Sequence, residues 1–255
     1  MLYGINKINK NTFVTDIVIQ DYRTATVFRK YGIDFCCGAK FPLEVACSMR
    51  ELNLESVCED LENAARTIYI PNILKFDKWD LCFLADYIVR VHHEYLRAAM
   101  PETLASLEQF AEGHQKKNSY LSELLSVFAA LVNEMLPHMV QEEEIIFPYI
   151  RQITHAFNSK EPYAGLLVRT LSKPVEFVMH HEHALVIKSL HRIRELTNDY
   201  CPPLNACTNH KVSFYSLREI DNDLVQHLHL ENNILFPKAI EMEKELLQNN
   251  YGAEV

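Results

Sequence analysis

The chain has 255 residues, of which 48% are hydrophobic and only 6 are glycine. No two glycines lie closer together than Gly32 and Gly38, which excludes the glycine-rich turn of dinucleotide-binding folds and the phosphate-binding P-loop. The formal net charge of -9 opposes binding to nucleic acid and to anionic lipid surfaces. No apolar run approaches the roughly 20 residues that span a bilayer, so we expect an all-α protein that binds neither nucleic acid nor a membrane.

Cysteine usage and the N-terminus predict the cellular compartment. The seven cysteines form an odd set, and the first residues, MLYGINKINKNTFV, lack the apolar core of a signal peptide. We therefore expect a protein of the reducing cytoplasm.

Residues 1–70 predict a small helical domain. The expected helices cover residues 16–31, a segment from 42, and 53–66. Gly32 follows the first helix and Pro42 opens the second, which is the usual punctuation of helix ends. Residues 68–76 contain a proline and lack helical punctuation, so they are expected to link this domain to a second one over 75–247.

Two adjacent cysteines, Cys36 and Cys37, stand in the turn after the first helix, with Gly38 and Lys40 close behind. A neighbouring lysine can lower a thiol pKa, which suits ligation of a metal, trapping of nitric oxide or a strained vicinal disulfide. Burial as small apolar side chains is the alternative. We treat the two cysteines as candidate iron- or NO-handling thiols.

Four long amphipathic segments follow and predict an antiparallel four-helix bundle. They cover 77–101, 119–149, part of 163–198, and 211–246. Asp77 and Asp80 resemble a capping box that opens the first of these helices, and Pro101 is expected to end it. No glycine interrupts the segments that carry the motif described next, so we expect regular α-helical backbone there.

Two of these helices share a motif. The segment from His138 reads HMVQEEEIIFP and the segment from His227 reads HLHLENNILFP, 89 residues further on, and both fit HxxxExxI[IL]FP. The other two helices each carry a lone histidine on the apolar stripe, His92 and His183, which are 91 residues apart. The bundle is therefore expected to consist of two copies of one helical hairpin.

The spacing of each motif places its glutamate on the apolar face, one turn after the histidine. Burying an isolated carboxylate is costly, and no lysine or arginine lies on the stripes nearby to pair with it. Two inward carboxylates and four inward imidazoles are a donor set for a two-metal site. The expected metal ligands are His92, His138, Glu142, His183, His227 and Glu231.

The same donor set leaves one position open on each of two six-coordinate ions, if both carboxylates and an oxo or hydroxo group bridge them. With only two anionic protein ligands, we expect binding or exchange of O2 or NO, or release of iron, in preference to oxygenation of hydrocarbons.

Residues close to the motifs have competing interpretations. In a regular helix, His93 is turned about 100° from His92 and is expected to face away. His180 lies one turn before His183 and competes with it as a ligand. Glu143 is expected at a solvated edge, and the Phe-Pro pairs are expected to be core aromatic residues followed by a kink or stop. The histidines expected on the surface or in loops are His114, His155, His191 and His210.

The sequence DFCCGA at 34–39, the segments HMVQEE and HLHLENNILFP, and the stretch from Pro202 to Thr208 together resemble the Repair of Iron Centres (RIC) family, the YtfE/ScdA-like di-iron proteins. The resemblance covers nearly the whole chain. Members join an ScdA-type N-terminal domain with a DFCCGG motif to a hemerythrin-like four-helix domain. Here Ala39 replaces the second glycine of that motif.

The resemblance implies two iron ions in a non-haem centre bridged by Glu142 and Glu231. It implies a cytoplasmic protein that repairs iron-sulfur clusters damaged by nitric oxide or peroxide, with Cys36 and Cys37 as participants. The implied partners are damaged iron-sulfur proteins, with NO or O2 as small ligands. Iron donation and NO reduction both stay open as mechanisms, as does a homodimer as the assembly.

Two rival interpretations remain at this point. One is a hemerythrin-like protein that binds or senses O2 or NO and repairs nothing. The other is a metal-free bundle, in which replacing Glu142 by leucine is harmless or stabilising.

Overall fold

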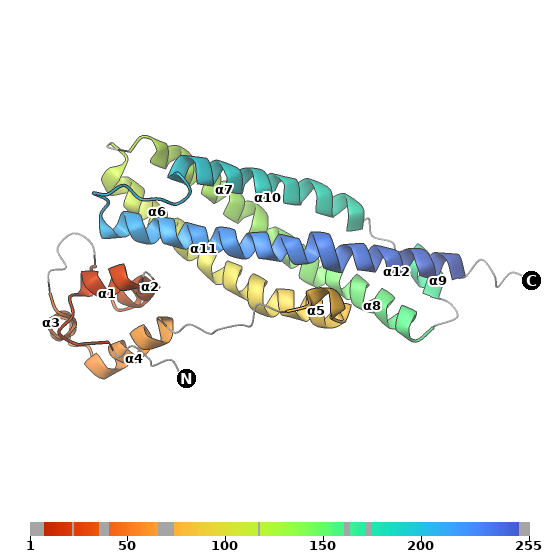
Figure 1. Ribbon diagram of the computed structural model, residues 1–255, viewed down its shortest axis with the longest axis horizontal. Coiled ribbons are helices and arrows are strands. Elements are labelled where there is room, and N and C mark those ends of the chain that lie inside the picture. The colour runs from red at the N-terminus through yellow and green to blue at the C-terminus, as the bar shows by residue number, and fades with distance from the viewer. Residues whose placement is uncertain are drawn as a thin grey trace, which may run out of the picture.

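A computed structural model describes residues 8–21, 23–35, 41–65, 74–116, 118–160, 164–171 and 175–249. These residues form helices and turns, with one isolated bridge between Phe13 and Pro42 and no strand (Figure 1). The predicted all-α class, a helical bundle preceded by a small helical region, is confirmed.

Four short helices make up the N-terminal region: α1 (Val14–Gln20), α2 (Thr24–Lys30), α3 (Leu43–Ser48) and α4 (Leu54–Ala64). The single helix expected over 16–31 is two helices, because the backbone becomes extended at Asp21. The carboxylate of Asp21 then accepts a hydrogen bond from the backbone N–H of Arg23 (3.1 Å), which begins the next turn. Gly32 has a φ of 63° and follows α2, as its position in the sequence predicts.

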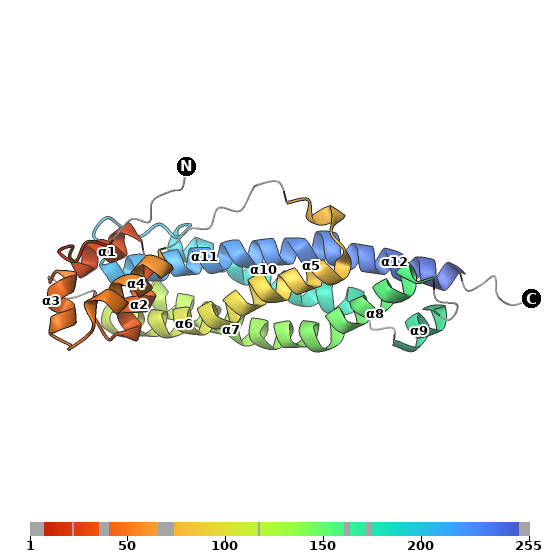
Figure 2. The ribbon, with the colours of Figure 1, turned by 90° about the horizontal axis from the view of Figure 1, so that it is seen from below.

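The N-terminal helices pack against the bundle. Their core is built around Val14, Phe28 and Leu43, and it includes Val212 from the bundle helix α11 (Thr208–Leu230). Figures 1 and 2 show these helices beside the end of the bundle at which α11 begins. Arg29 also donates hydrogen bonds across this contact, to Ser106 (2.5 Å) and to Glu102.

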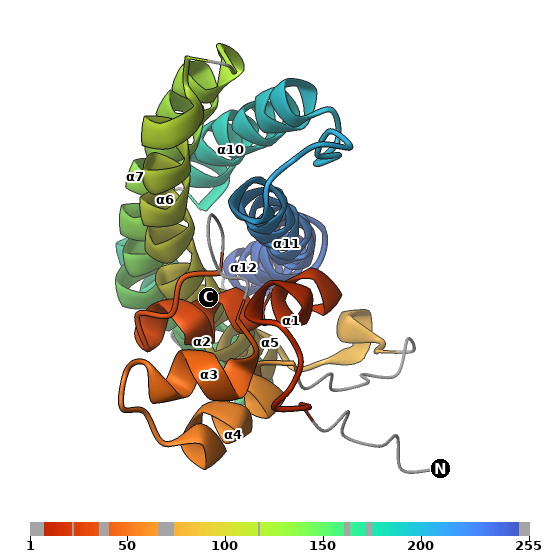
Figure 3. The same ribbon diagram turned by 90° about the vertical axis from the view of Figure 1, so that its left-hand side faces the viewer.

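The bundle consists of four long helical arms, three of which are interrupted by a π-helical turn. Figure 3 shows them end-on, with α6 and α7 on one side and α10 and α11 on the other. The 3-10 turn η1 (Phe76–Lys78) precedes the first arm. The arms are α5 (Leu81–Tyr87), η2 (Ile88–His93) and α6 (Glu94–His114); α7 (Tyr120–Gln141), η3 (Glu142–Ile146) and α8 (Phe147–Asn158); α9 (Ala164–Leu171) and α10 (Val175–Thr197); and α11, η4 (Glu231–Leu235) and α12 (Phe236–Asn249).

The expected regular backbone at the motifs is wrong: η3 and η4 begin at the two motif glutamates. A π-turn holds one residue more than an α-turn and occurs mostly as a single turn, frequently at a functional site. Absence of glycine excludes one cause of irregular backbone, but the π-turn does not require glycine.

The prolines end none of these helices. Pro101 lies inside α6, which continues to His114, so the expected helix end there is wrong. Pro148 and Pro237 each follow a π-turn, and the helices α8 and α12 continue past them. Since a π-turn already changes the backbone hydrogen-bond pairing, a residue without an N–H is accommodated there.

The first arm begins at a different residue from the one expected. Asp80, and not Asp77, is the N-cap residue of α5, and its carboxylate accepts hydrogen bonds from the backbone N–H groups of Cys82 (2.9 Å) and Phe83 (3.2 Å). The helix therefore starts at Leu81.

Two apolar clusters fill the bundle. One contains Leu96, Phe128 and Leu224, and the other contains Ile88 and Phe236. Each continuous arm passes from one cluster to the other at its π-turn. Buried polar side chains lie in the interior between these two clusters.

One stretch of the described residues, Tyr120–Asn158, is long and apolar enough by composition to cross a membrane. Its side chains include Leu124, Phe128 and Met135, which are fully buried in the bundle. These residues belong to the apolar interior of the bundle.

His210, expected on the surface or in a loop, is 4% exposed near the start of α11. Its Nε2 lies 3.0 Å from the hydroxyl of Tyr120, and its ring centroid lies 4.5 Å from that of Phe214. Burial, with a smaller contribution from His114, lowers the pKa of His210 to about 4. His210 is therefore a neutral structural residue.

We predict that His210 makes the fold less stable in mild acid. In the unfolded chain its pKa is about 6.5, so as the pH falls from there towards 4 the unfolded state takes up a proton that the folded state refuses. His210→Phe should remove about 3 kcal/mol of this pH dependence. Urea denaturation from pH 7 to 4 measures it, with exposed His191→Gln as the control; equal pH profiles for both variants would contradict the prediction.

Candidate metal centre

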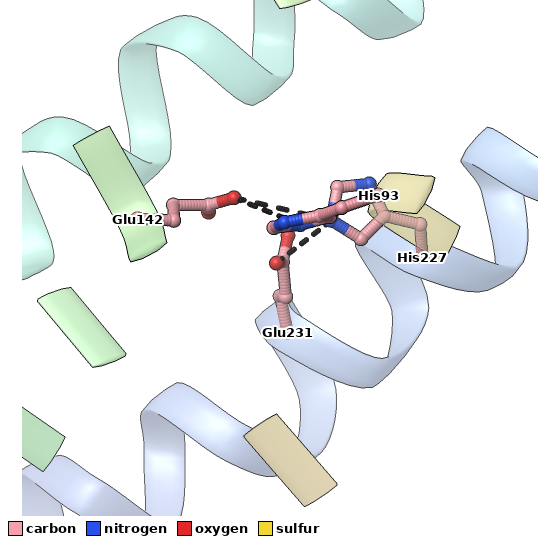
Figure 4. Close-up of side chains that lie close together, drawn as sticks. All are labelled: His93, Glu142, His227 and Glu231. Atoms are coloured by element: carbon pink, nitrogen blue, oxygen red, sulfur yellow. Dashed lines mark hydrogen bonds and ion pairs between the residues drawn. The ribbon is translucent and has the colours of Figure 1, made fainter. Parts of the chain in front are cut away.

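Six buried histidine and glutamate side chains meet inside the bundle, between the two apolar clusters. They are supplied by η2, α7, η3, α10, α11 and η4, and each is at most 5% exposed. Figure 4 shows four of them pointing toward one another. The six residues are His93, His138, Glu142, His183, His227 and Glu231.

The four histidines form two pairs. The Nε2 atoms of His93 and His227 are 3.1 Å apart, and those of His138 and His183 are also 3.1 Å apart. Two nitrogens bound to one ion at about 2.1 Å each, in adjacent positions, lie about 3 Å from each other. Each pair therefore has the spacing of two ligands of a common ion.

Each glutamate reaches both histidine pairs, with one oxygen near each. Oε1 of Glu142 is 3.2 Å from Nε2 of His138, and its Oε2 is 3.4 Å from Nε2 of His93. Oε1 of Glu231 is 2.8 Å from Nε2 of His227, and its Oε2 is 3.6 Å from Nε2 of His183. Both carboxylates are thus placed to bridge two ions.

Histidines surround the carboxylates of both glutamates. Within the described part of the chain, the ion-pair partners of both are histidines. Oε2 of Glu142 and Oε2 of Glu231 are buried without a hydrogen-bond partner, which is costly for a carboxylate. Bound cations would remove that cost, and imidazole with carboxylate is a donor set that suits iron and zinc.

Burial and mutual repulsion separate the pKa values of the two glutamates. Burial favours the neutral form of Glu142, but the imidazoles of His138 and His93 outweigh it and hold the pKa of Glu142 well below its usual range. Burial and the charge of Glu142 raise the pKa of Glu231 to about 8. Burial lowers the pKa of His227 to about 3. The cluster therefore keeps His227 neutral, the form that binds a metal.

Hydrogen bonds outside the cluster orient two of its histidines. Nδ1 of His93 donates to Glu143 (2.8 Å), which also accepts from Arg97 (2.7 Å), and Nδ1 of His183 donates to Oδ1 of Asn232 (2.7 Å). Such bonds fix the tautomer so that Nε2 faces the metal. Glu143 was expected at a solvated edge, but this contact gives it a place beside the cluster.

The structure brings together five of the six expected ligands and places His93 where His92 was expected. The expectation assumed a regular α-helix, in which His93 faces away. The π-turn η2, which ends at His93, holds one residue more than an α-turn, and this brings His93 to the inward position. His92 is also buried, but its Nδ1 pairs with Asp223 (3.0 Å).

The internal repeat contains a weak signal for His93. In the second hairpin, 44 residues separate His183 from His227. In the first, 45 separate His93 from His138, against 46 for His92. Comparing these separations, rather than the apolar stripe alone, favours His93.

Several predicted residues cannot be placed. Cys36 and Cys37 lie outside the described residues, and so do the side chains of His180 to Glu182. Of the two competing ligands His180 and His183, the structure places His183 in the cluster.

We predict that Asn232→Ala lowers metal affinity by about 10–100-fold, because it removes the hydrogen bond that orients His183. The neighbouring Asn233 is exposed and contacts His229, so Asn233→Ala is the matched control. Competition for Fe(II) against a chromophoric chelator measures both affinities. Equal affinities in the two variants would show that the bond to His183 has no such role.

Comparisons with known proteins identify two domains in this chain. Residues 84–239 match the family described as "Hemerythrin HHE cation binding domain", and residues 10–65 match ScdA_N, a domain of unknown function. The chain is 32% identical over 231 residues to a Pectobacterium atrosepticum protein named "Iron-sulfur cluster repair protein YtfE", covering 89% of this chain and 96% of that protein. Proteins of the same name from Enterobacter sp. (strain 638) and Escherichia coli O17:K52:H18 are 30% and 31% identical, covering 88% and 86% of this chain and 94% and 91% of theirs.

Both matched stretches fall inside the predicted domains 1–70 and 75–247, whose boundaries stay predictions. The described bundle supplies the buried histidines and glutamates that a cation-binding domain of this kind needs. The chain therefore belongs to the YtfE-like family of iron-sulfur cluster repair proteins, in which an ScdA-type N-terminal domain precedes a hemerythrin-like domain.

Proposed function

We propose that the chain is a non-haem di-iron protein of the cytoplasm that repairs iron-sulfur clusters damaged by nitrosative or oxidative stress. The observation that carries the proposal is the sharing of Glu142 and Glu231 between two histidine pairs, with one oxygen of each glutamate near each pair. The curated relatives carry the name of this activity.

His93 and His227 would hold one iron, His138 and His183 would hold the other, and the two glutamates would be shared between them. Iron bound here would supply labile Fe(II) to a damaged cluster or bind NO or O2. Two carboxylates are few anionic ligands for two iron ions, which favours release of iron over high oxidation states. This supports iron donation as the working activity, with damaged iron-sulfur proteins as its partners.

The side chains of the protein have three tasks in this proposal. His93 and His183 are held in one tautomer by Glu143 and Asn232, so that Nε2 faces the interior. The apolar clusters on both sides exclude water from the glutamates. Glu231, with its pKa raised to about 8, holds a proton at neutral pH when no cation compensates it, and releases that proton when a cation binds.

The decisive experiment combines metal analysis with a repair assay. Protein purified without oxygen should contain about two irons per chain with a di-iron Mössbauer signature, and it should reactivate an enzyme whose cluster NO has damaged. Zinc in place of iron in metal-replete protein would overturn the di-iron centre. Iron without reactivation would favour the rival O2- or NO-binding protein.

We predict that Glu142→Leu abolishes di-iron binding while the helical fold is retained. Leucine removes a bridging ligand from both ions and places no charge at this buried position. Iron per chain and far-UV circular dichroism measure the two effects. In a metal-free bundle the wild type would contain no iron, and the variant would be as stable as the wild type or more stable. Iron content unchanged from the wild type would refute the bridging role.

We further predict that the double variant Cys36→Ala/Cys37→Ala impairs repair at least tenfold and leaves the iron content unchanged. In the sequence Lys40 follows Cys37 by three residues, and a lysine close to a thiol favours the thiolate form. Exposed Cys201→Ala is the control. Full repair by the double variant would exclude the cysteine pair from the activity.

A further inference from the structure

His92 has the surroundings of a metal ligand without belonging to the cluster. It is 1% exposed, and its Nδ1 lies 3.0 Å from Oδ1 of Asp223, so that Nδ1 donates to the carboxylate. Its Nε2 is buried and has no hydrogen-bond partner. A carboxylate on one ring nitrogen and a free lone pair on the other is the usual arrangement of a histidine that binds a metal.

We propose that His92 and His93 are alternative ligands of the same iron, one for each of two registers of the helix around η2. This inference rests on the di-iron centre proposed above. His93 binds in the π-helical register that the structure shows, and His92 takes its place when the turn becomes α-helical.

The spacing of apolar residues in the sequence fits the register with His92 inward, and the structure shows the register with His93 inward. With α-helical spacing, Leu84, Ile88 and His92 follow one another at intervals of four residues on the inward stripe. The π-turn η2 contains the additional residue that moves His93 to the inward position instead. Removing the bulge therefore brings His92 to the place that His93 now occupies.

The rings of His92 and His93 both lie next to the ring of His227. The ring of His92 is stacked on that of His227, with centroids 6.0 Å apart and planes 22° apart, and His227 is the partner of His93 in the cluster. Both candidate histidines therefore lie beside the same fixed ligand. With iron bound, the exchange would break one iron–nitrogen bond and form another. It needs no proton or electron transfer, since both rings keep the proton on Nδ1.

His92 also lies on the side of the bundle that opens toward a cavity. Tyr95, one turn after His92, and Glu219, one turn before Asp223, both line a cavity of about 260 Å³ between α2, α6 and α11. Transfer of iron from His93 to His92 would therefore be a first step out of the buried centre.

Leucine variants of single histidines test the exchange. His93→Leu should keep iron near the wild-type content, because His92 replaces the lost ligand. His138→Leu is the matched control, since its neighbours Pro137 and Met139 offer no strong donor, and it should lose iron. The double variant His92→Leu/His93→Leu should behave like the control, with an affinity at least about tenfold below that of His93→Leu.

The release rate gives a second readout, which does not depend on the stability of the histidine variants. Asp223→Asn weakens the support of His92 and should slow iron transfer to a chelator by about tenfold, with the iron content unchanged. Circular dichroism confirms that each variant is folded.

The outcomes separate the two proposals. Wild-type protein without iron would overturn the di-iron centre itself. If wild type binds two irons and His138→Leu loses them, equal loss in His93→Leu together with a wild-type release rate in Asp223→Asn would overturn the exchange alone.

Discussion

The structure of this bundle depends on the burial of two carboxylates whose ion-pair partners, among the described residues, are histidines. Glu142 and Glu231 are 2% and 0% exposed, and a leucine at either position would pack without an electrostatic cost. Retaining two acids there makes the interior unfavourable unless the surrounding imidazoles and bound cations compensate them. Each of the four arms accordingly contributes one of the imidazoles. The requirement to compensate the carboxylates thus explains why polar residues meet at one level of an otherwise apolar interior.

The π-turns connect this requirement to the backbone. Two of them begin at the glutamates and the third ends at His93, whereas the arm that carries His183 has no such turn among its described residues. A π-turn is less favourable than an α-turn, so three in one bundle imply that something specific to the site stabilises them. Each turn rotates the residues that follow it relative to those before it. The two apolar clusters can therefore both be packed well while the ligands between them take positions that an uninterrupted α-helix would not give.

Most of the bundle could be predicted from the sequence, because its apolar residues recur at helical spacing and its metal-binding motif is repeated. The repeated HxxxE motif predicted that His138 and His227 face inward with their glutamates, and the structure brings these four residues together. Helix boundaries were predicted less well where a single residue was used as the signal. Pro101 was expected to end a helix, but it lies inside α6. The choice between His92 and His93 failed for a different reason. A register shift of one residue leaves the composition and the motif unchanged, and it depends on how the two apolar clusters pack, which is a tertiary effect.

The same shift explains why two successive buried histidines exist at all. A helix has one inward position per turn at this level, so one of two adjacent histidines would ordinarily be exposed, yet His92 and His93 are 1% and 0% exposed. Each has its own carboxylate, Asp223 for His92 and Glu143 for His93, and these come from different arms. A residue that only filled space would not need a charged partner. The first arm is therefore built to hold an imidazole in place in either register, whereas His138 has a single register and no histidine beside it.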